Sequence, residues 1–270
     1  MINEKYLIAL DLDGTLLRDD KTISPQSKHM IQQAKQAGHV VVIATGRPYR
    51  SSALYYQELE LTTPIVNFNG AFIHHPKDDQ WGVYHTPMAL ETVKQIVEAS
   101  EKFHIKNILA EVIDDVYFHY HDEKLLDIFS LGNPTIRTGD LREILKQDVT
   151  SMLIHSDEKH VDAIRAHLSN VHAELIDHRR WGAPWHIIEI VKSGLNKAVG
   201  LKRIAEYYNI PPKRIIAFGD EDNDLEMIEF AGHGVAMENA VPELKQLAKD
   251  ITKSNEEDGI AVYLKKILAL

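Results

Sequence analysis

The sequence predicts an α/β protein, in which a doubly wound, mostly parallel, Rossmann-like core sheet is interrupted by an inserted α+β cap domain. Short runs of consecutive apolar residues, typical of strands buried on both faces of a sheet, alternate with helical patterns near both ends of the chain. Three of these runs end in polar loops. Between about residues 84 and 190 the runs give way to alternating strand patterns, which predict a separate module.

Composition excludes several classes of protein. The chain has 270 residues and a formal net charge of −10, and its Lys and Arg residues are not clustered, which argues against a general affinity for nucleic acid or for anionic membranes. Cysteine is absent, so disulfides, thiolate nucleophiles and cysteine-bound zinc are excluded. No apolar run approaches the ~18 residues that span a bilayer, and the first residues lack a signal-peptide pattern. We therefore expect a cytoplasmic protein.

The first buried run lies within residues 6–17 and ends in two aspartates. Asp11 closes the predicted strand, and the alternation of an extended chain points Asp11 and Asp13 the same way. Gly14 allows a sharp turn, and Thr15 places a hydroxyl nearby. Ligand sites in open α/β sheets lie beyond the carboxyl ends of the strands, so this pair of acids is a candidate site. The alternative is an ordinary solvated turn, in which Asp and Gly are common.

Helix and strand patterns then alternate in the first part of the chain. Ser24 and Pro25 form an N-cap followed by a proline at the first helical position, which predicts a helix at 25–37. Asn69 followed by Gly70 is a hairpin signal between two short strands. The strands predicted in this part are at 39–44, 64–68 and 71–74.

The middle segment, 84–190, is predicted to be the inserted cap domain. Its strands alternate apolar and polar residues, which favours an antiparallel sheet with helices on one face. The segments 1–83 and 191–270 are then predicted to form one discontinuous core domain. The elements predicted in the cap are strands at 107–112, 116–121, 149–155, 173–176 and 186–191, and helices at 91–103 and 158–168.

The doubly wound pattern resumes after the middle segment. Ser193 and Gly194 precede a helical pattern, and Pro211 with Pro212 ends it before the next buried strand. The elements predicted here are strands at 214–218 and 234–237, and helices at 196–208, 225–231, 241–249 and 260–268.

Three of the buried strands lead into polar sequences, DLDGT, TGR and GDEDND. A doubly wound sheet brings these ends to one edge, so carboxylates, a hydroxyl and a lysine are expected to meet there. This set of groups suits Mg²⁺-dependent phosphoryl transfer, because a cation must offset the repulsion between a carboxylate and a phosphate dianion. The expected Mg²⁺ ligands are Asp11, Asp220 and the backbone carbonyl of Asp13, with Asp224 and Asn223 orienting metal-bound water or the phosphate, and Thr45 and Lys197 binding phosphoryl oxygens.

Two of these residues have simpler interpretations. A lysine near the start of a helix is usually a solvated surface group, which is the alternative for Lys197. Thr45 could merely cap the helix that follows it.

The motifs resemble those of the haloacid dehalogenase superfamily, and within it the Cof-like phosphatases with a C2-type α/β cap. The four motifs occur in the order found in that family, and the resemblance covers the whole chain. The residues that match are Asp11, Asp13, Gly14 and Thr15 in the first motif, Thr45, Gly46 and Arg47 in the second, Lys197 in the third, and Gly219, Asp220, Asn223 and Asp224 in the fourth.

The resemblance implies a Mg²⁺-dependent phosphatase that acts on phosphate monoesters of small metabolites, such as sugar phosphates or nucleotide and cofactor precursors. Asp11 would form an aspartyl-phosphate, and Asp13 would protonate the leaving alcohol and then activate water. The N–H of Leu12 would bind the phosphoryl group together with Thr45 and Gly46. The partner expected is therefore a small phosphorylated metabolite, and the oligomeric state is not predicted.

Several residues are candidates for contact with the rest of the substrate. Trp181 and Trp185 lie in a loop of the predicted cap and could line a pocket, or equally fill the core of the cap. Asn69 and Gly70 could form a floor under the substrate. Arg47 either pairs with an acid in a structural role or faces the cap.

Other functions remain open from the sequence. A phosphomutase shares the aspartyl-phosphate chemistry but returns the phosphoryl group to its substrate. A signalling receiver also carries an aspartate, a hydroxyl and a lysine at strand ends, but it is about half this length and lacks the second acid of the DLD sequence. An inactive binding protein is disfavoured because Asp11, Asp13, Lys197 and Asp220 are all present.

Overall fold

A computed structural model describes residues 4–103, 105–172, 174–180 and 186–269, so the predicted pocket residues Trp181 and Trp185 lie outside the described residues. The chain divides into two structural units. The first unit is Met1–Gly46, Ser52–Val83 and Asn196–Leu270, and the second is Arg47–Ser51 and Tyr84–Leu195. Among the described residues, none of the helices has the length and apolar character needed to cross a bilayer.

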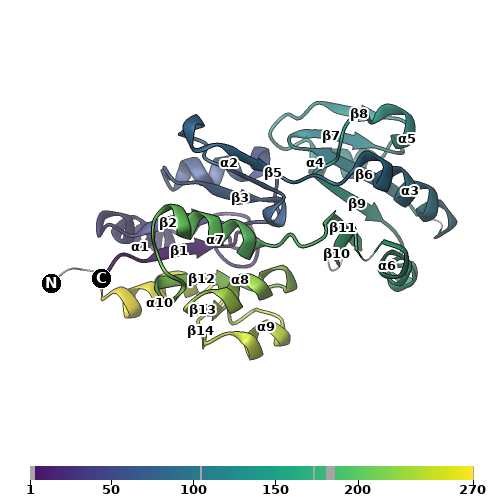
Figure 1. The fold of residues 1–270 in the computed structure, drawn as a ribbon. Helices are drawn as coiled ribbons and strands as arrows, with labels where there is room; N and C mark the ends of the chain where they lie inside the picture. The colour runs from purple at the N-terminus through teal and green to yellow at the C-terminus, as the bar shows by residue number, and fades with distance from the viewer. Residues whose placement is uncertain (1–3, 104, 173, 181–185, 270) are drawn as a thin grey trace. The chain divides into compact units, whose positions relative to one another are not determined.

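The first unit is built on a parallel sheet with the strand order β14-β13-β12-β1-β2 (Figure 1). β1 lies between β12 and β2, and every residue of these three strands is buried, as the continuous apolar runs predict. All neighbouring strands run parallel, which confirms the predicted doubly wound α/β core. The strands are β1 (Leu7–Leu10), β2 (Val40–Ile43), β12 (Ile215–Gly219), β13 (His233–Ala236) and β14 (Asp250–Ile251).

Helices flank this sheet, with α1 packed against α10 and α7 against α8 (Figure 1). α1 begins as the sequence predicts, because the Ser24 side chain accepts a hydrogen bond from the N–H of Ser27 and Pro25 occupies the first helical position. The helices of the first unit are α1 (Pro25–Gln36), α2 (Tyr49–Glu58, which begins in the second unit), α7 (Lys197–Tyr207), α8 (Leu225–Phe230), α9 (Pro242–Leu247) and α10 (Gly259–Leu268).

A small antiparallel sheet follows the second parallel strand, with the order β3-β4-β5. A short 3₁₀ turn, η1 (Phe68–Gly70), joins the first two strands where the sequence predicts a hairpin. The strands are β3 (Ile65–Asn67), β4 (Phe72–His74) and β5 (Val83–His85).

The second unit contains a six-stranded sheet with the order β10-β11-β9-β6-β7-β8. Neighbouring strands run antiparallel except β7 and β8, which are parallel. The strands are β6 (Asn107–Val112), β7 (Asp115–Phe118), β8 (Ile136–Thr138), β9 (Ser151–His155), β10 (Ile176–Arg180) and β11 (Ile187–Lys192). The helices are α3 (Leu90–Ser100), α4 (Glu123–Phe129), α5 (Leu141–Ile144) and α6 (Glu158–His172).

This sheet is covered on both faces, so the prediction of helices on one face is wrong. Ile108 and Ile154 belong to the larger core, which includes residues of α3, α5 and α6. Leu109 and Leu153, one position along, belong to a second core with residues of α4. Alternation along each strand sends these neighbours to opposite faces. α4 has only seven residues, which is too short for a recognisable helical period in the sequence.

One strand of the second unit is displaced from its prediction at 173–176. α6 continues to His172, and β10 begins only at Ile176. The position of β10 is set by its antiparallel pairing with β11, in which Ile176 lies opposite Lys192. β10 itself, IDHRR, contains a single apolar residue and so has no strand pattern in the sequence.

Candidate active site

The three polar loops meet because their strands are neighbours in one parallel sheet. The strand register places Leu10 opposite Phe218 on one side and Ile43 on the other. Asp11 follows directly, and its N–H donates to the carbonyl of Phe218 at 3.3 Å. Asp220 and Thr45 each lie two residues beyond the paired positions, so the predicted convergence at the carboxyl edge is present in the first unit.

Lys197 is the central cation of the site. It is the first residue of α7, and its side chain is 0% exposed. Its Nζ donates to Oδ1 of Asp11 at 2.7 Å and to Oδ1 of Asp224 at 2.8 Å. The N-cap Asn196, whose side chain accepts from the N–H of Val199, fixes the start of the helix that carries it. Lys197 is therefore not the solvated surface lysine that the sequence left open.

The acids of the fourth motif are held by their own backbone. Oδ2 of Asp224 accepts from the N–H of Asp220 at 3.0 Å and from that of Glu221 at 3.2 Å. Oδ1 of Asp220 accepts from the hydroxyl of Thr15 at 2.7 Å. These bonds fix both carboxylates, and one oxygen each of Asp11, Asp220 and Asp224 lies within 4.8 Å of the other two.

The electrostatics of this cluster fit a divalent cation. Burial raises the pKa of Asp11, Lys197 lowers it, and the neighbouring Asp224 raises it again. Burial also raises the pKa of Asp220, as do Asp11 and Asp224. Burial alone would lower the pKa of Lys197, but Asp11 and Asp224 outweigh it and hold that pKa above its ordinary value. One lysine cannot neutralise three ionised carboxylates, so the site lacks two positive charges, and hard carboxylate oxygens are the ligands that Mg²⁺ prefers.

Gly14 forms the turn that follows Asp13 in the first motif. Its φ is +71°, and a Cβ atom there would lie 2.1 Å from Oδ2 of Asp220. Both the backbone conformation and the space next to Asp220 therefore require glycine. The Nδ2 group of Asn239 donates to the carbonyl of Gly14 at 2.8 Å and holds the turn from the far end of the chain.

Asp13 has a more open environment than Asp11. Its Oδ1 lies 2.8 Å from Nζ of Lys21, and the two side chains are 43% and 55% exposed respectively. Lys21 and Asn239 were not among the residues predicted for the site. Their contacts with the first motif come from the fold of a loop and from a residue more than two hundred positions away, and neither leaves a pattern in the sequence.

The second-motif residues adjoin the η1 turn. The carbonyl of Thr45 accepts from the N–H of Asn69 at 3.1 Å, and Nδ2 of Asn223 donates to Oδ1 of Asn69 at 3.1 Å. A Cβ atom at Gly46 would lie 3.2 Å from Nδ2 of Asn69. The structure thus brings the substrate candidate Asn69 together with Thr45, Gly46 and Asn223.

Three further residues were predicted for the site, and each has its own contacts: Gly70, Arg47 and Leu12. Gly70 has a φ of +96°, and a Cβ atom there would lie 2.4 Å from the carbonyl oxygen of Asn196, so this glycine allows η1 to pack against the start of α7. Arg47 belongs to the second unit, where its Nη1 donates to the carbonyl of Ser51 at 3.4 Å. The side chain of Leu12 is buried, and its carbonyl accepts from the N–H of Leu17 at 2.8 Å.

The sequence profile of the haloacid dehalogenase-like hydrolases matches residues 8–264, nearly the whole chain. The chain belongs to this family. It is 64% identical over 270 residues to the 5-amino-6-(5-phospho-D-ribitylamino)uracil phosphatase YitU of Bacillus subtilis, with all of both chains covered. It is 32% identical over 290 residues to YwtE, which bears the same enzyme name in B. subtilis, with 97% of this chain and 98% of the relative covered.

The solved structures agree with this assignment. A haloacid dehalogenase-like hydrolase from Bacteroides thetaiotaomicron superposes with a TM-score of 0.83 at 28% identity, covering 98% of this chain and 100% of that one. Family membership and the phosphatase relatives identify the protein as a phosphoric monoester hydrolase.

Proposed function

We propose that the protein hydrolyses 5-amino-6-(5-phospho-D-ribitylamino)uracil to the free alcohol and inorganic phosphate, with Mg²⁺ as cofactor. The observation that carries the phosphatase chemistry is the buried cluster in which Lys197 joins Asp11 and Asp224 beside Asp220. The choice of substrate is supported by the 64% identity to YitU over the full length of both chains. The same substrate name recurs at 32% identity in YwtE.

Asp11 is the proposed nucleophile. One of its carboxylate oxygens attacks phosphorus, and the bond from phosphorus to the alcohol oxygen breaks. Asp13 donates its proton to that oxygen, so the ribityl alcohol leaves neutral. Asp13 then takes a proton from water as the water oxygen bonds to phosphorus and the bond to Asp11 breaks. The second step releases inorganic phosphate and regenerates the Asp11 carboxylate and the protonated Asp13.

The different surroundings of the two acids support this division of roles. Asp11 is held in one position by Lys197 and is almost fully buried, which suits a group that must attack along a fixed line. Asp13 is part exposed and lies beside the exposed Lys21, so it can exchange protons with a leaving group and with water.

The phosphoryl oxygens are proposed to bind the N–H groups of Leu12 and Gly46, the hydroxyl of Thr45 and the Nδ2 group of Asn223. Lys197 adds a positive charge beside Asp11. Positioned donors of this kind stabilise the charge that spreads over the phosphoryl oxygens in the transition state. The contacts of Thr45, Gly46 and Asn223 around Asn69 support this grouping.

Mg²⁺ would be held by Asp11, Asp220 and Asp224 with the backbone carbonyl of Asp13, and would offset the repulsion between the Asp11 carboxylate and the phosphate. The surplus of negative charge around Lys197 supports this ligand set. Thr15 and the backbone N–H groups of Asp220 and Glu221 keep the acids in place before any cation binds.

The first unit is proposed as the catalytic core, and the second as the cap that selects the alcohol part of the substrate. The phosphate chemistry is the same for every monoester, so selectivity must come from residues beyond the core motifs. The architecture of the second unit supports this division, because that unit has a six-stranded sheet and two apolar cores of its own. Arg47, Asn69 and Gly70 are proposed to contact the part of the substrate beyond its phosphate.

The test is the rate of inorganic phosphate release from 5-amino-6-(5-phospho-D-ribitylamino)uracil, ribose 5-phosphate, pyridoxal phosphate and an aryl phosphate, each with Mg²⁺ or EDTA. We expect the first compound to have the highest kcat/KM, by roughly tenfold or more if its alcohol contributes about 1.4 kcal/mol of selective binding. A higher value for another ester would overturn the substrate proposal. Transfer of phosphate between esters without release would instead indicate a mutase.

A further inference from the structure

Arg50 lies in a five-residue segment of the second unit that is flanked on both sides by residues of the first. Only Arg47–Ser51 are grouped with Tyr84–Leu195, whereas Gly46 and Ser52 are in the first unit. This short segment continues directly from the Thr45–Gly46 loop and opens α2. Whatever holds Arg50 therefore also restrains the peptide that leaves the proposed phosphate-binding loop.

Three contacts attach Arg50 to the end of β6 and to the turn between β6 and β7. Its Nη2 forms an ion pair with Oε1 of Glu111, and both side chains are only 5% exposed. Its Nη1 donates to the carbonyl of Ile113 at 3.4 Å. Its backbone N–H donates to Oδ1 of Asp114 at 3.1 Å. Arg50 thus contacts the end of β6 and two positions of the turn, using both its side chain and its backbone.

A second segment packs against Arg50 as well. Gly132 has a φ of +84°, and a Cβ atom there would lie 2.6 Å from the carbonyl oxygen of Arg50 and 2.7 Å from its Cβ. Glycine is required at this position because any side chain would collide with Arg50. The contact leaves Arg50 little freedom to move away from the turn.

Stability alone does not account for the buried ion pair between Arg50 and Glu111. Burial raises the pKa of Glu111, and Arg50 only opposes that rise, so part of the attraction is spent on desolvation. Buried pairs of this kind often contribute little net stability compared with apolar side chains of the same size. A role in fixing the geometry of the turn accounts for the pair better.

The turn itself is strained in a way that requires such support. Ile113 has a φ of +56°, which is rare for a β-branched residue. Its N–H donates to Oγ1 of Thr150 at 2.8 Å, and its carbonyl accepts from Arg50. Residues in this backbone region persist only where their surroundings hold them on several sides.

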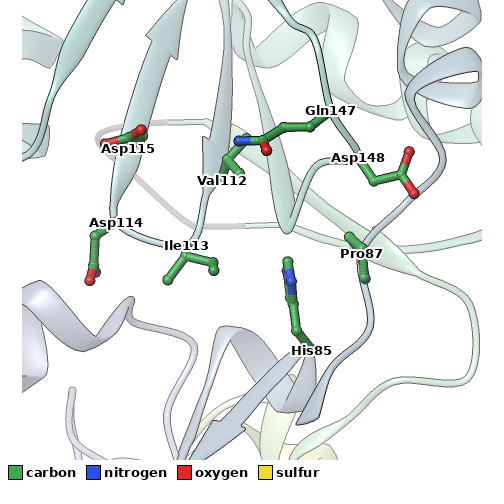
Figure 2. Close-up of a pocket in the computed structure, with 8 residues that line it drawn as sticks. All are labelled: His85, Pro87, Val112, Ile113, Asp114, Asp115, Gln147 and Asp148. Atoms are coloured by element: carbon green, nitrogen blue, oxygen red, sulfur yellow. The ribbon is translucent and has the colours of Figure 1, made fainter. Parts of the chain in front are cut away.

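The braced turn forms one wall of a pocket of about 500 Å³ in the second unit (Figure 2). Figure 2 shows Ile113 and Asp114 on one side of the pocket and Pro87 with Asp148 on the other. His85 enters from below, with its Nε2 2.9 Å from Oγ1 of Thr150, the hydroxyl that also accepts from Ile113. A pocket of this size accommodates the alcohol part of a small metabolite.

We propose that Arg50 is a positioning residue for substrate selectivity. Through Glu111 and the β6–β7 turn it fixes the wall of this pocket, and through its own backbone it ties that wall to the peptide leaving Thr45 and Gly46. The pocket then selects the alcohol part of the substrate, and its geometry depends on Arg50. This role rests on the proposed phosphatase function.

The first test is a ratio of two specificity constants, measured for wild type, Arg50→Met, Arg50→Lys and Glu111→Gln. The numerator is kcat/KM for 5-amino-6-(5-phospho-D-ribitylamino)uracil, and the denominator is kcat/KM for an aryl phosphate with a small leaving group. Partial unfolding lowers both constants equally and leaves the ratio unchanged. We expect the ratio to fall at least tenfold in Arg50→Met and Glu111→Gln, through a higher KM for the first substrate, and less in Arg50→Lys, which keeps the charge.

The matched control is Arg142→Met, which removes an exposed arginine that pairs with Glu101 and Asp140 in the same unit. Its ratio should equal that of wild type. We expect the double variant Arg50→Met/Glu111→Gln to lose no more selectivity than either single variant, because the two residues act as one unit. An unchanged ratio in Arg50→Met, or a fall of the same size in Arg142→Met, would overturn the proposal.

Hydrogen exchange supplies a second test that needs no substrate. Arg50→Met should speed amide exchange in the turn around Ile113, and Glu111→Gln should speed it in Arg47–Ser51, each at the segment that was not mutated. Faster exchange confined to the mutated segment would contradict the brace. If wild type released phosphate from neither ester, the proposed function would fail while reciprocal exchange would still establish the brace.

Discussion

Nζ of Lys197 lies 2.7 Å from Oδ1 of Asp11 and 2.8 Å from Oδ1 of Asp224, with the lysine side chain fully buried. One cation therefore fixes the proposed nucleophile at the end of β1 and an acid in the turn between β12 and α8. The relationship gives Lys197 two separate effects, on the stability of the first unit and on the rate of phosphate transfer.

Lys197→Met separates these effects. Removing one partner from a buried ionic cluster leaves uncompensated charge, so we expect the free energy of unfolding in EDTA to fall by about 3–5 kcal/mol. Activity should fall by about 10²–10³-fold or more, since a preorganised charge at the phosphoryl group is lost. Chemical denaturation and phosphate release measure the two quantities. Lys202→Met, which removes an exposed lysine from the same helix, should change neither, and a fully active Lys197→Met would contradict the assigned role.

Gly14→Ala tests the close packing between the first and fourth motifs. The new methyl group would need space now filled by the Asp220 carboxylate, and alanine at positive φ costs about 1–2 kcal/mol in addition. We expect lower stability and loss of most activity, measured by thermal unfolding and phosphate release. Gly194→Ala is the matched control, because Gly194 also has a positive φ but nothing lies within 4 Å of the position of its Cβ. Equal effects of the two substitutions would show that contact with Asp220 is unimportant.

Asp220→Asn tests the proposed metal site without measuring turnover. A ligand that binds only the folded protein stabilises it by about 2.7 kcal/mol at a concentration one hundred times its Kd. We expect Mg²⁺ to raise the unfolding temperature of the wild type and to raise that of Asp220→Asn much less. Asp222→Asn, in the same loop, should keep the wild-type response. A Mg²⁺ response of Asp220→Asn equal to that of the wild type would rule out Asp220 as a ligand.

The pH dependence of stability should include a contribution from His74. Burial, and to a smaller extent His75, lowers the pKa of His74 from 6.5 to about 4 in the folded protein. Between these values the unfolded chain binds the proton more tightly, so the free energy of unfolding falls as the pH falls from about 6.5 towards 4. Denaturant titrations across this range should show a shallower fall in His74→Gln than in wild type. The exposed His29→Gln should follow the wild type, and parallel curves for His74→Gln would contradict the assignment.

The parts of the fold that depend on local pattern could be predicted from the sequence. The buried runs at β1, β2 and β12 identify themselves by consecutive apolar residues, and the polar loops after them mark one edge of the sheet. α4 and β10 could not be placed, because α4 has only seven residues and β10 contains a single apolar residue. Pairing with a neighbouring strand rather than local propensity decides an element such as β10.

The active site likewise contains residues whose placement could be predicted from the sequence and residues whose placement could not. Asp11, Thr45 and Asp220 follow predicted strands, so their proximity could be expected from topology. Complete burial of Lys197 could not be expected, since it depends on the packing of α7 against α8 and η1. Lys21, Asn239 and Arg50 were missed for a related reason, because their partners are fixed by loops and turns that leave no periodic pattern in the sequence.

The most direct test of the central claim is to find the phosphoryl group on the enzyme. Wild type and Asp11→Asn are mixed with 5-amino-6-(5-phospho-D-ribitylamino)uracil and Mg²⁺, quenched with acid within one turnover, digested and analysed by mass spectrometry. We predict one phosphoryl group on Asp11 of the wild type, and neither phosphopeptide nor phosphate release from Asp11→Asn. A phosphoryl group on a different residue, or turnover retained by Asp11→Asn, would contradict the role of Asp11 as nucleophile.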